Sequence, residues 1–236
     1  MKSLFAALLF LLAAVTTQAA KPRPFVFVPK GAAEPYPVAV WLHGYRGYSP
    51  EGYVAGEKAE AFQKQADALG AVILGFPATT DLGDGTQQWS EEPVADHAYI
   101  QDRLKALTKD LKVDLKRVGL FGFSQGAMVA ADLASLYPES YRGAILMSPG
   151  GMGLPKAPAK KLPIHATQVY YCFCGAEENE ANVGLTHFYA DHLEKTLGAK
   201  VTLKLYEGVS KHTRPPDFMT RFTTWMGAIL KPADQK

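Results

Sequence analysis

The sequence has very little cysteine, and what it has is poorly placed for a metal or redox site. Only Cys172 and Cys174 occur among its 236 residues. A single C-x-C pair with no second pair supplies too few ligands for zinc and is not a redox motif. On a strand the two side chains would share one face, with vectors that do not converge as a disulfide requires. We therefore expect two buried thiols.

The chain also lacks a charge excess and, after its first 20 residues, any long apolar run. Its 25 Lys and Arg residues nearly balance its 23 Asp and Glu residues. There is no basic patch of the kind that nucleic acid requires, so nucleic acid is excluded as a partner. A bilayer span needs about 20 apolar residues, and no later segment has that length. We therefore expect no stable membrane anchor. Repeats and low-complexity tracts are absent as well.

The first 20 residues have the three-part composition of a secretory signal peptide. Met1-Lys2 is basic, Leu4–Val15 is apolar, and Thr16–Ala20 is small and polar. The apolar run is too short for a membrane span, so an uncleaved anchor is the weaker interpretation. The pattern predicts a secreted or periplasmic protein. Residues 21–236 then fit a single α/β domain.

Strand-like and helix-like segments alternate along this domain. Continuous apolar runs, which suit strands covered on both faces, are followed by one alternating run, Val201–Tyr206, which suits an edge strand. The runs are Phe25–Val28, Val38–Leu42, Ala71–Phe76, Val118–Phe123, Ala144–Met147 and Val169–Cys174. Helical patterns cover Ala55–Leu69, Ile100–Leu111, Ala127–Tyr137, Val183–Leu197 and Phe218–Leu230. This order predicts an α/β fold with a doubly wound, mostly parallel sheet.

One motif carries chemistry. Gly122-Phe123-Ser124-Gln125-Gly126 is a G-x-S-x-G pentapeptide, with a predicted strand before it and a predicted helix after it. A strand that turns sharply into a helix exposes the central serine at the top of the sheet. The helix start points N–H groups at the same place, where they would stabilise a developing negative charge. We therefore predict that Ser124 is a nucleophile. The alternative is a glycine-rich turn without chemistry.

A nucleophilic serine needs a base and an acid, expected later in the chain in the order Ser, Asp or Glu, His. Of six histidines, only His212 directly follows the last predicted strand, so His212 is the predicted base. The other five have plausible structural or solvated roles; they are His43, His97, His165, His187 and His192.

The predicted acid lies in a loop with three glutamates. Glu177, Glu178 and Glu180 all follow Gly175, and no aspartate is present. Glu178 is preferred, because Glu177 still belongs to the strand end and Glu180 lies at a helix start, where negative charge has a structural role. All three remain candidates, as does a solvated acidic loop or a weak calcium site.

The oxyanion hole needs two amide donors, one after the nucleophile and one from an early loop. Gln125 and Tyr45, which follows His43-Gly44, are the predicted donors; an ordinary glycine-rich turn is the alternative. In the long 79–95 connection, Trp89 could be a substrate-contacting pocket wall or merely structural. Asp81 and Asp84 suit a solvated turn better than a calcium site.

Four segments of the sequence together resemble a known superfamily. They are His43-Gly44, Gly122–Met128, Tyr137-Pro138-Glu139 and Ser148-Pro149-Gly150. The chain is similar to α/β-hydrolases, and within them to the phospholipase/carboxylesterase and dienelactone-hydrolase-like group, more loosely to secreted feruloyl esterases and polyhydroxybutyrate depolymerases. The resemblance implies an α/β-hydrolase fold and a secreted serine esterase. It also implies an acyl-enzyme on Ser124, a small-molecule or polymeric ester substrate, and no metal or organic cofactor. The group usually has aspartate where this chain has Glu178.

Two further expectations concern the size of the site and other functions. Residues 150–166 are too short and too broken by glycine and proline for a helical cap, so we expect no cap domain. A secreted non-catalytic binding protein with the same fold is one alternative function. A serine peptidase or acyltransferase is another, and the reaction products would separate these classes.

Overall fold

The computed structural model describes residues 24–47, 57–90, 92–150 and 167–231. The predicted signal peptide and nearly all of the 150–166 segment therefore lie outside the described residues.

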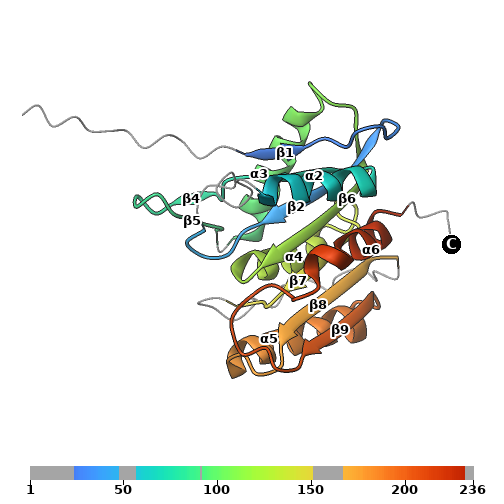
Figure 1. Ribbon diagram of the computed structural model, residues 1–236. Coiled ribbons are helices and arrows are strands. Elements are labelled where there is room, and N and C mark those ends of the chain that lie inside the picture. The colour runs from blue at the N-terminus through green and yellow to red at the C-terminus, as the bar shows by residue number, and fades with distance from the viewer. Residues whose placement is uncertain (1–23, 48–56, 91, 151–166, 232–236) are drawn as a thin grey trace, which may run out of the picture.

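A central sheet of seven strands organises the described part of the chain (Figure 1). Its strand order is β1-β3-β2-β6-β7-β8-β9, and every neighbouring pair is parallel except β1 with β3. The strands are β1 (Phe25–Phe27), β2 (Tyr36–Leu42), β3 (Val72–Gly75), β6 (Val113–Phe123), β7 (Gly143–Met147), β8 (Val169–Gly175) and β9 (Lys200–Tyr206). Every strand expected from the apolar runs is present, and β9 lies at the edge as predicted.

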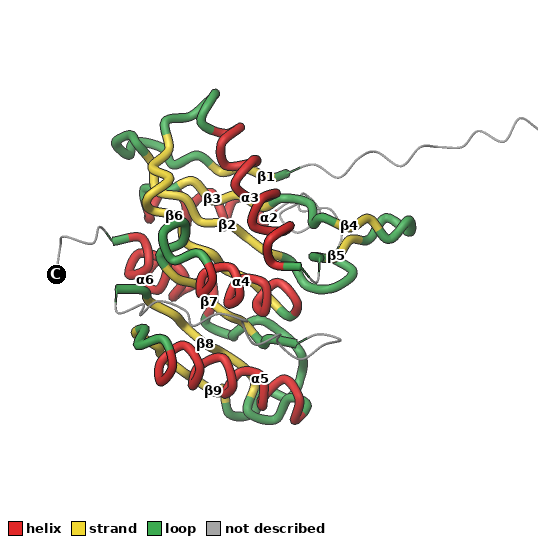
Figure 2. The backbone as a smooth tube through the Cα atoms, turned by 180° about the vertical axis from the view of Figure 1, so that it is seen from behind, coloured by secondary structure: helices red, strands yellow, loops and turns green. Residues whose placement is uncertain are grey.

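Helices pack on both faces of the sheet, which Figures 1 and 2 show from opposite sides. Strand β2 shows why its apolar run is continuous. Val38, Val40 and Leu42 face one core, whereas Ala39 and Trp41 face the other. The first core includes residues of α3 (Pro93–Leu107), α4 (Gln125–Leu136) and α5 (Glu180–Asp191); the second includes residues of α2 (Glu57–Leu69) and α6 (Phe218–Leu230). This is the expected doubly wound arrangement.

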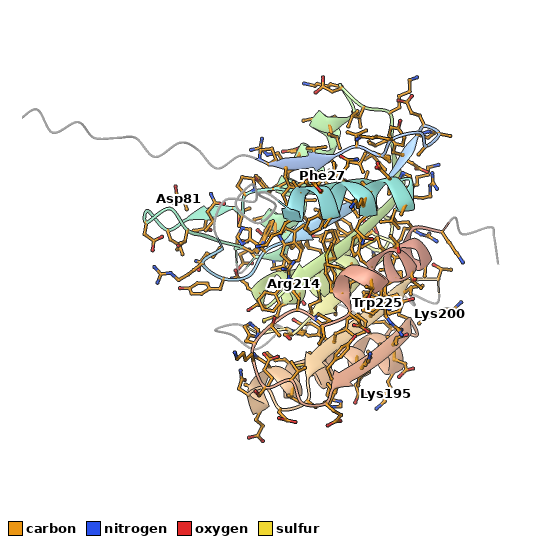
Figure 3. The ribbon with its side chains drawn as sticks, viewed as in Figure 1. Phe27, Asp81, Lys195, Lys200, Arg214 and Trp225 are labelled. Atoms are coloured by element: carbon orange, nitrogen blue, oxygen red, sulfur yellow. The ribbon has the colours of Figure 1, made fainter. Side chains whose placement is uncertain are left out.

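Both faces are closed by large side chains. Trp225 of α6, labelled in Figure 3, packs its ring 4.3 Å from that of Phe173 on β8. On the opposite face, Ile100 and Leu104 of α3 are fully buried. Cys172 and Cys174 are free, buried thiols, as expected, and burial raises the pKa of Cys174 to about 11. None of the helices in the described residues has both the length and the apolar character needed to cross a bilayer.

The long connection before α3 has more structure than the sequence indicated. It forms a small antiparallel pair, β4 (Thr80–Asp81) and β5 (Gln87–Gln88). Figure 3 shows Asp81 on this hairpin, away from the sheet. The Asp81 carboxylate accepts the Gly83 amide at 2.8 Å, which is a turn role. Within the described residues, no group of three or more acidic, His or Cys side chains gathers as a metal site.

Helix α5 begins earlier than its apolar periodicity suggested. It starts at Glu180, because the Asn179 side chain accepts the Asn182 amide at 3.0 Å and so caps the first turn. It ends at Asp191 and continues as one π turn over His192–Thr196. The earlier start brings Asn182 into the helix, next to the acidic loop.

Candidate active site

Ser124 lies in the strained turn between β6 and α4. Its backbone angles are φ 57° and ψ −123°, in a region that non-glycine residues rarely adopt. The Ser124 amide donates to Met147 O at the end of β7, at 3.0 Å, and α4 begins at the next residue. Strain of this kind persists only where the surrounding structure enforces it, and it often marks functional sites.

The glycines around Ser124 are required by close backbone approach. A Cβ on Gly122 would lie 2.1 Å from Gly126 O, and one on Gly126 would lie 2.1 Å from Leu42 O. A Cβ on Gly44 would lie 3.1 Å from that of Ser124. The elbow is therefore packed against the end of β2, and the loop after β2 lies directly beside the serine.

His212 and Glu178 meet at the same end of the sheet. The Nδ1 atom of His212 and the Oε1 atom of Glu178 are hydrogen-bonded and form an ion pair when the ring is protonated. The His212 ring also packs against Phe123, the residue before Ser124, with ring centroids 4.6 Å apart. The side chain of His212 is 36% exposed, whereas that of Glu178 is 1% exposed. An accessible imidazole with a buried carboxylate behind it lies beside the elbow.

The other two glutamates do not reach His212. Glu177 is exposed, and its Oε1 accepts the Gly208 amide at 3.0 Å. Glu180 is exposed in the first turn of α5. Of the three candidates, the structure brings only Glu178 to the histidine.

Four donors surround the Glu178 carboxylate. Asn182 Nδ2 donates to Oε1 at 2.6 Å alongside His212, while Ser148 Oγ at 3.0 Å and Cys174 Sγ at 3.3 Å donate to Oε2. Burial alone would raise the pKa of Glu178, but the hydrogen bonds from Asn182, His212, Cys174 and Ser148 outweigh it and lower that pKa. The carboxylate is therefore held ionised although it is buried.

The loop after β2 holds one peptide plane in a fixed orientation. Gly44 O accepts hydrogen bonds from His43 Nδ1 at 2.8 Å and from the Gly47 amide at 3.0 Å. Burial lowers the pKa of His43, so its ring is neutral and carries its proton on Nδ1 to donate. Because the 44–45 peptide is trans, the Tyr45 N–H points away from this turn. Tyr45 directly follows Gly44, and Gln125 directly follows Ser124. The two predicted amide donors are therefore the chain neighbours of two residues that lie against each other.

Trp89 is placed differently from a pocket wall. It has no exposed surface, and its Nε1 donates to His43 O at 2.9 Å. Its backbone N–H donates to Gln125 Oε1 at 3.1 Å. Trp89 is therefore not the substrate-contacting pocket wall that was one of its two predicted roles: its buried indole braces His43, its backbone N–H braces Gln125, and no face of the ring is open to a ligand.

The Ser124 hydroxyl has a hydrogen-bond partner of its own. Its Oγ donates to Gly150 O at 3.4 Å, a long hydrogen bond. The hydroxyl must therefore rotate away from Gly150 to give its proton to a base.

Sequence reasoning missed the residues that support Glu178. Ser148 follows β7 directly, has φ 43° and is 1% exposed, which a sequence does not reveal. Asn182 lies in the first turn of α5 and Glu178 lies before its Asn179 cap, so helical spacing did not indicate their contact.

The sheet order, the strained serine between β6 and α4, and the acid–histidine pair at the carboxyl ends of the strands define an α/β-hydrolase. Solved structures agree on the fold. A Bacillus cereus carboxylesterase superposes with a TM-score of 0.67 at 19% identity, over 89% of this chain and 96% of that one. An S-formylglutathione hydrolase from Agrobacterium tumefaciens gives a TM-score of 0.62 at 19% identity, over 88% and 90%.

Sequence comparison gives the family. The phospholipase/carboxylesterase family matches residues 85–229, more than half of the sequence. The protein belongs to this family of carboxylic ester hydrolases. A curated relative from Nocardia uniformis subsp. tsuyamanensis, named "Putative esterase NocK", is 27% identical over 158 residues. That match covers 66% of this chain and 44% of the relative, so the chain spans less than half the length of that protein.

Proposed function

We propose that the protein is a serine esterase that hydrolyses carboxylic esters in two steps through an acyl-enzyme on Ser124. The observation that carries the proposal is the pairing of His212 with the buried Glu178 next to the strained serine elbow. Family membership supports the ester-hydrolase chemistry. Without that pair, the elbow alone would be only a tight turn.

In the first step, His212 Nε2 takes the proton of Ser124 Oγ while the oxygen attacks the ester carbonyl carbon. The carbonyl oxygen becomes an oxyanion that accepts hydrogen bonds from the Tyr45 and Gln125 amides. Collapse of this intermediate expels the alcohol, which receives the proton from His212. Glu178 accepts the Nδ1–H bond throughout, so it holds the correct tautomer and stabilises the imidazolium.

In the second step, water replaces the alcohol. His212 removes a proton from the water, whose oxygen attacks the acyl-enzyme carbonyl. The new oxyanion uses the same two amides, and its collapse releases the carboxylic acid and returns the proton to Ser124 Oγ. These two reaction steps therefore need no group beyond the side chains and amides named here.

The substrate class proposed is a small or polymeric carboxylic ester. The side chain of Tyr45 is exposed and follows Gly44, which lies against the elbow, and the side chain of His212 is 36% exposed. Both features favour a substrate that approaches from solvent. Chromogenic esters of graded acyl length, compared with feruloyl and polyester substrates, would identify the acyl and alcohol parts that the protein prefers.

We also propose that the protein works outside the cytoplasm, since residues 1–20 have signal-peptide composition. N-terminal sequencing of the protein recovered from its native cell fractions tests this. A mature chain that begins near residue 20 or 21 supports export, and an intact Met1 in the cytoplasmic fraction contradicts it.

The test of the nucleophile uses a covalent probe. An organophosphonate should label Ser124 and no other residue, and Ser124→Ala should abolish labelling and lower kcat by about 10⁵- to 10⁶-fold, because triad members act as a unit. Circular dichroism should show an unchanged fold. Label on another residue, or wild-type turnover by the alanine variant, would refute the proposal. Free acid, released amine or transfer to an added alcohol distinguishes an esterase from a peptidase or an acyltransferase.

A further inference from the structure

The Asn182 side chain contacts both members of the acid–base pair. Its Nδ2 atom lies 2.6 Å from Glu178 Oε1 and 3.1 Å from His212 Nδ1. Two donors, the amide and the imidazole N–H, thus converge on one carboxylate oxygen. Asn182 is only 9% exposed, so water does not compete freely for these contacts.

The position of Asn182 is fixed from two directions. Its backbone N–H is bound by the Asn179 cap at the start of α5, at 3.0 Å. On the other side, a Cβ on Gly150 would come within 2.6 Å of Asn182 Oδ1, so only glycine leaves room for the amide there. Gly150 is also the residue whose carbonyl accepts the Ser124 hydroxyl. The amide is therefore packed between the nucleophile's partner and the acid.

A glutamate has a particular need for such a support. Its side chain has one more rotatable bond than that of aspartate, so its carboxylate can occupy more positions. Ser148 and Cys174 hold only Oε2. Without a second donor on Oε1, the carboxylate could rotate about its terminal bond and leave the histidine.

We propose that Asn182 is a positioning residue that clamps Oε1 of Glu178 where His212 Nδ1 can donate to it, and so keeps the glutamate side chain in place as the acid of the reaction. The inference rests on the proposed function, since it assigns a role within the same site. It adds that a carboxylate at position 182 would itself be within hydrogen-bond distance of His212 Nδ1.

The first test removes the clamp. Asn182→Ala should lower kcat by about 10- to 100-fold, the range for losing a hydrogen bond to a charged group. KM should stay within about twofold of wild type, since Asn182 contacts the acid and base rather than the substrate. Gly184→Ala is the matched control on the same helix, because a Cβ there meets nothing within 4 Å. Wild-type kcat for Asn182→Ala would overturn the inference.

The second test reverses the polarity of the pair. Glu178→Gln supplies an amide that can donate, and Asn182→Asp supplies a carboxylate that can accept where Asn182 donated, with no change in the number of heavy atoms. In the double variant, the carboxylate at position 182 can accept both His212 Nδ1–H and the new amide. We expect the double variant to recover at least tenfold in kcat over Glu178→Gln alone. A merely structural asparagine would give no such recovery.

The outcomes separate this inference from the proposed function. If Glu178→Gln is impaired and adding Asn182→Asp gives no gain, the clamp is wrong while the esterase mechanism stands. If Glu178→Gln and Ser124→Ala both turn over esters like the wild type, the proposed mechanism itself is wrong. Recovery in the double variant, lost again with Ser124→Ala, supports both.

Discussion

The exchange of Glu178 for glutamine separates the charge of the acid from its packing. All four partners of the carboxylate are donors in the wild type, so an amide group introduced there must turn its NH₂ toward one of them. Ser148 can accommodate it, because its hydroxyl also lies 3.1 Å from Thr213 O and can donate there while accepting from the amide. The amide oxygen then remains beside Asn182 and His212. Glu178→Gln should therefore stay folded and hydrogen-bonded, but neutral.

The expected effect on catalysis is large and the effect on stability is small. Losing the negative charge leaves the His212 imidazolium without its counter-ion, and kcat should fall by at least about 10²-fold and by up to about 10⁴-fold. The fall is measured with a chromogenic ester under saturating substrate. Glu177→Gln, at an exposed position that does not reach the histidine, is the matched control and should behave like the wild type.

Glu178→Ala removes the packing and hydrogen bonds of the side chain as well as its charge, so it should lower stability as well as activity. It removes the acceptor and leaves the buried Asn182 amide with an unpaired donor, at a cost of roughly 1–3 kcal/mol. For a chain of this size each kcal/mol lowers Tm by about 2–4 °C, so a thermal melt should distinguish alanine from glutamine. If Glu178→Gln keeps kcat within threefold of wild type, Glu178 is not the acid, and its four hydrogen-bond donors have no role in catalysis.

Two further predictions concern residues outside the acid–base pair. Burial raises the pKa of Asp132 on α4 to about 7, so the unfolded chain releases this proton at lower pH than the folded one, and the carboxyl group lowers stability progressively as pH rises from about 4 to 7. Asp132→Asn should therefore raise Tm at pH 8 and leave it unchanged near pH 4; equal Tm gains at both pH values would contradict this. Trp89→Phe keeps an aromatic ring but removes the donor to His43 O, and kcat should fall about three- to tenfold with little change in KM, as steady-state kinetics would measure.

The order of strands and helices was predictable because buried parallel strands and amphipathic helices leave strong periodic patterns. The run Val38–Leu42 is apolar throughout because β2 is covered on both faces, and the alternating run Val201–Tyr206 became the edge strand β9. The serine elbow was predictable because its glycines are required where backbone segments approach too closely for any side chain. These features are local, so a sequence carries them directly.

The surroundings of the acid were not predictable, because they depend on contacts between distant segments. Ser148 and Glu178 are 30 residues apart, and Glu178 and His212 are 34 apart. Nothing in the spacing indicates that the Trp89 indole would turn inward to the His43 carbonyl instead of facing a substrate. One capping hydrogen bond at Asn179 lets α5 begin at Glu180 and not at the predicted Val183, and Asn182 in this extra turn contacts Glu178.

The carboxylate of Glu178 is bound by groups from four separate parts of the chain: the residue after β7, strand β8, helix α5 and the loop after β9. Local openings of a folded protein range in free energy from near zero up to that of global unfolding, and they occur in contiguous units of the chain. Any opening that releases one of these four segments removes a hydrogen bond from the carboxylate that His212 contacts. The position of the carboxylate therefore depends on several parts of the fold at once, and we expect local loosening at any of them to lower the proposed activity before the protein unfolds.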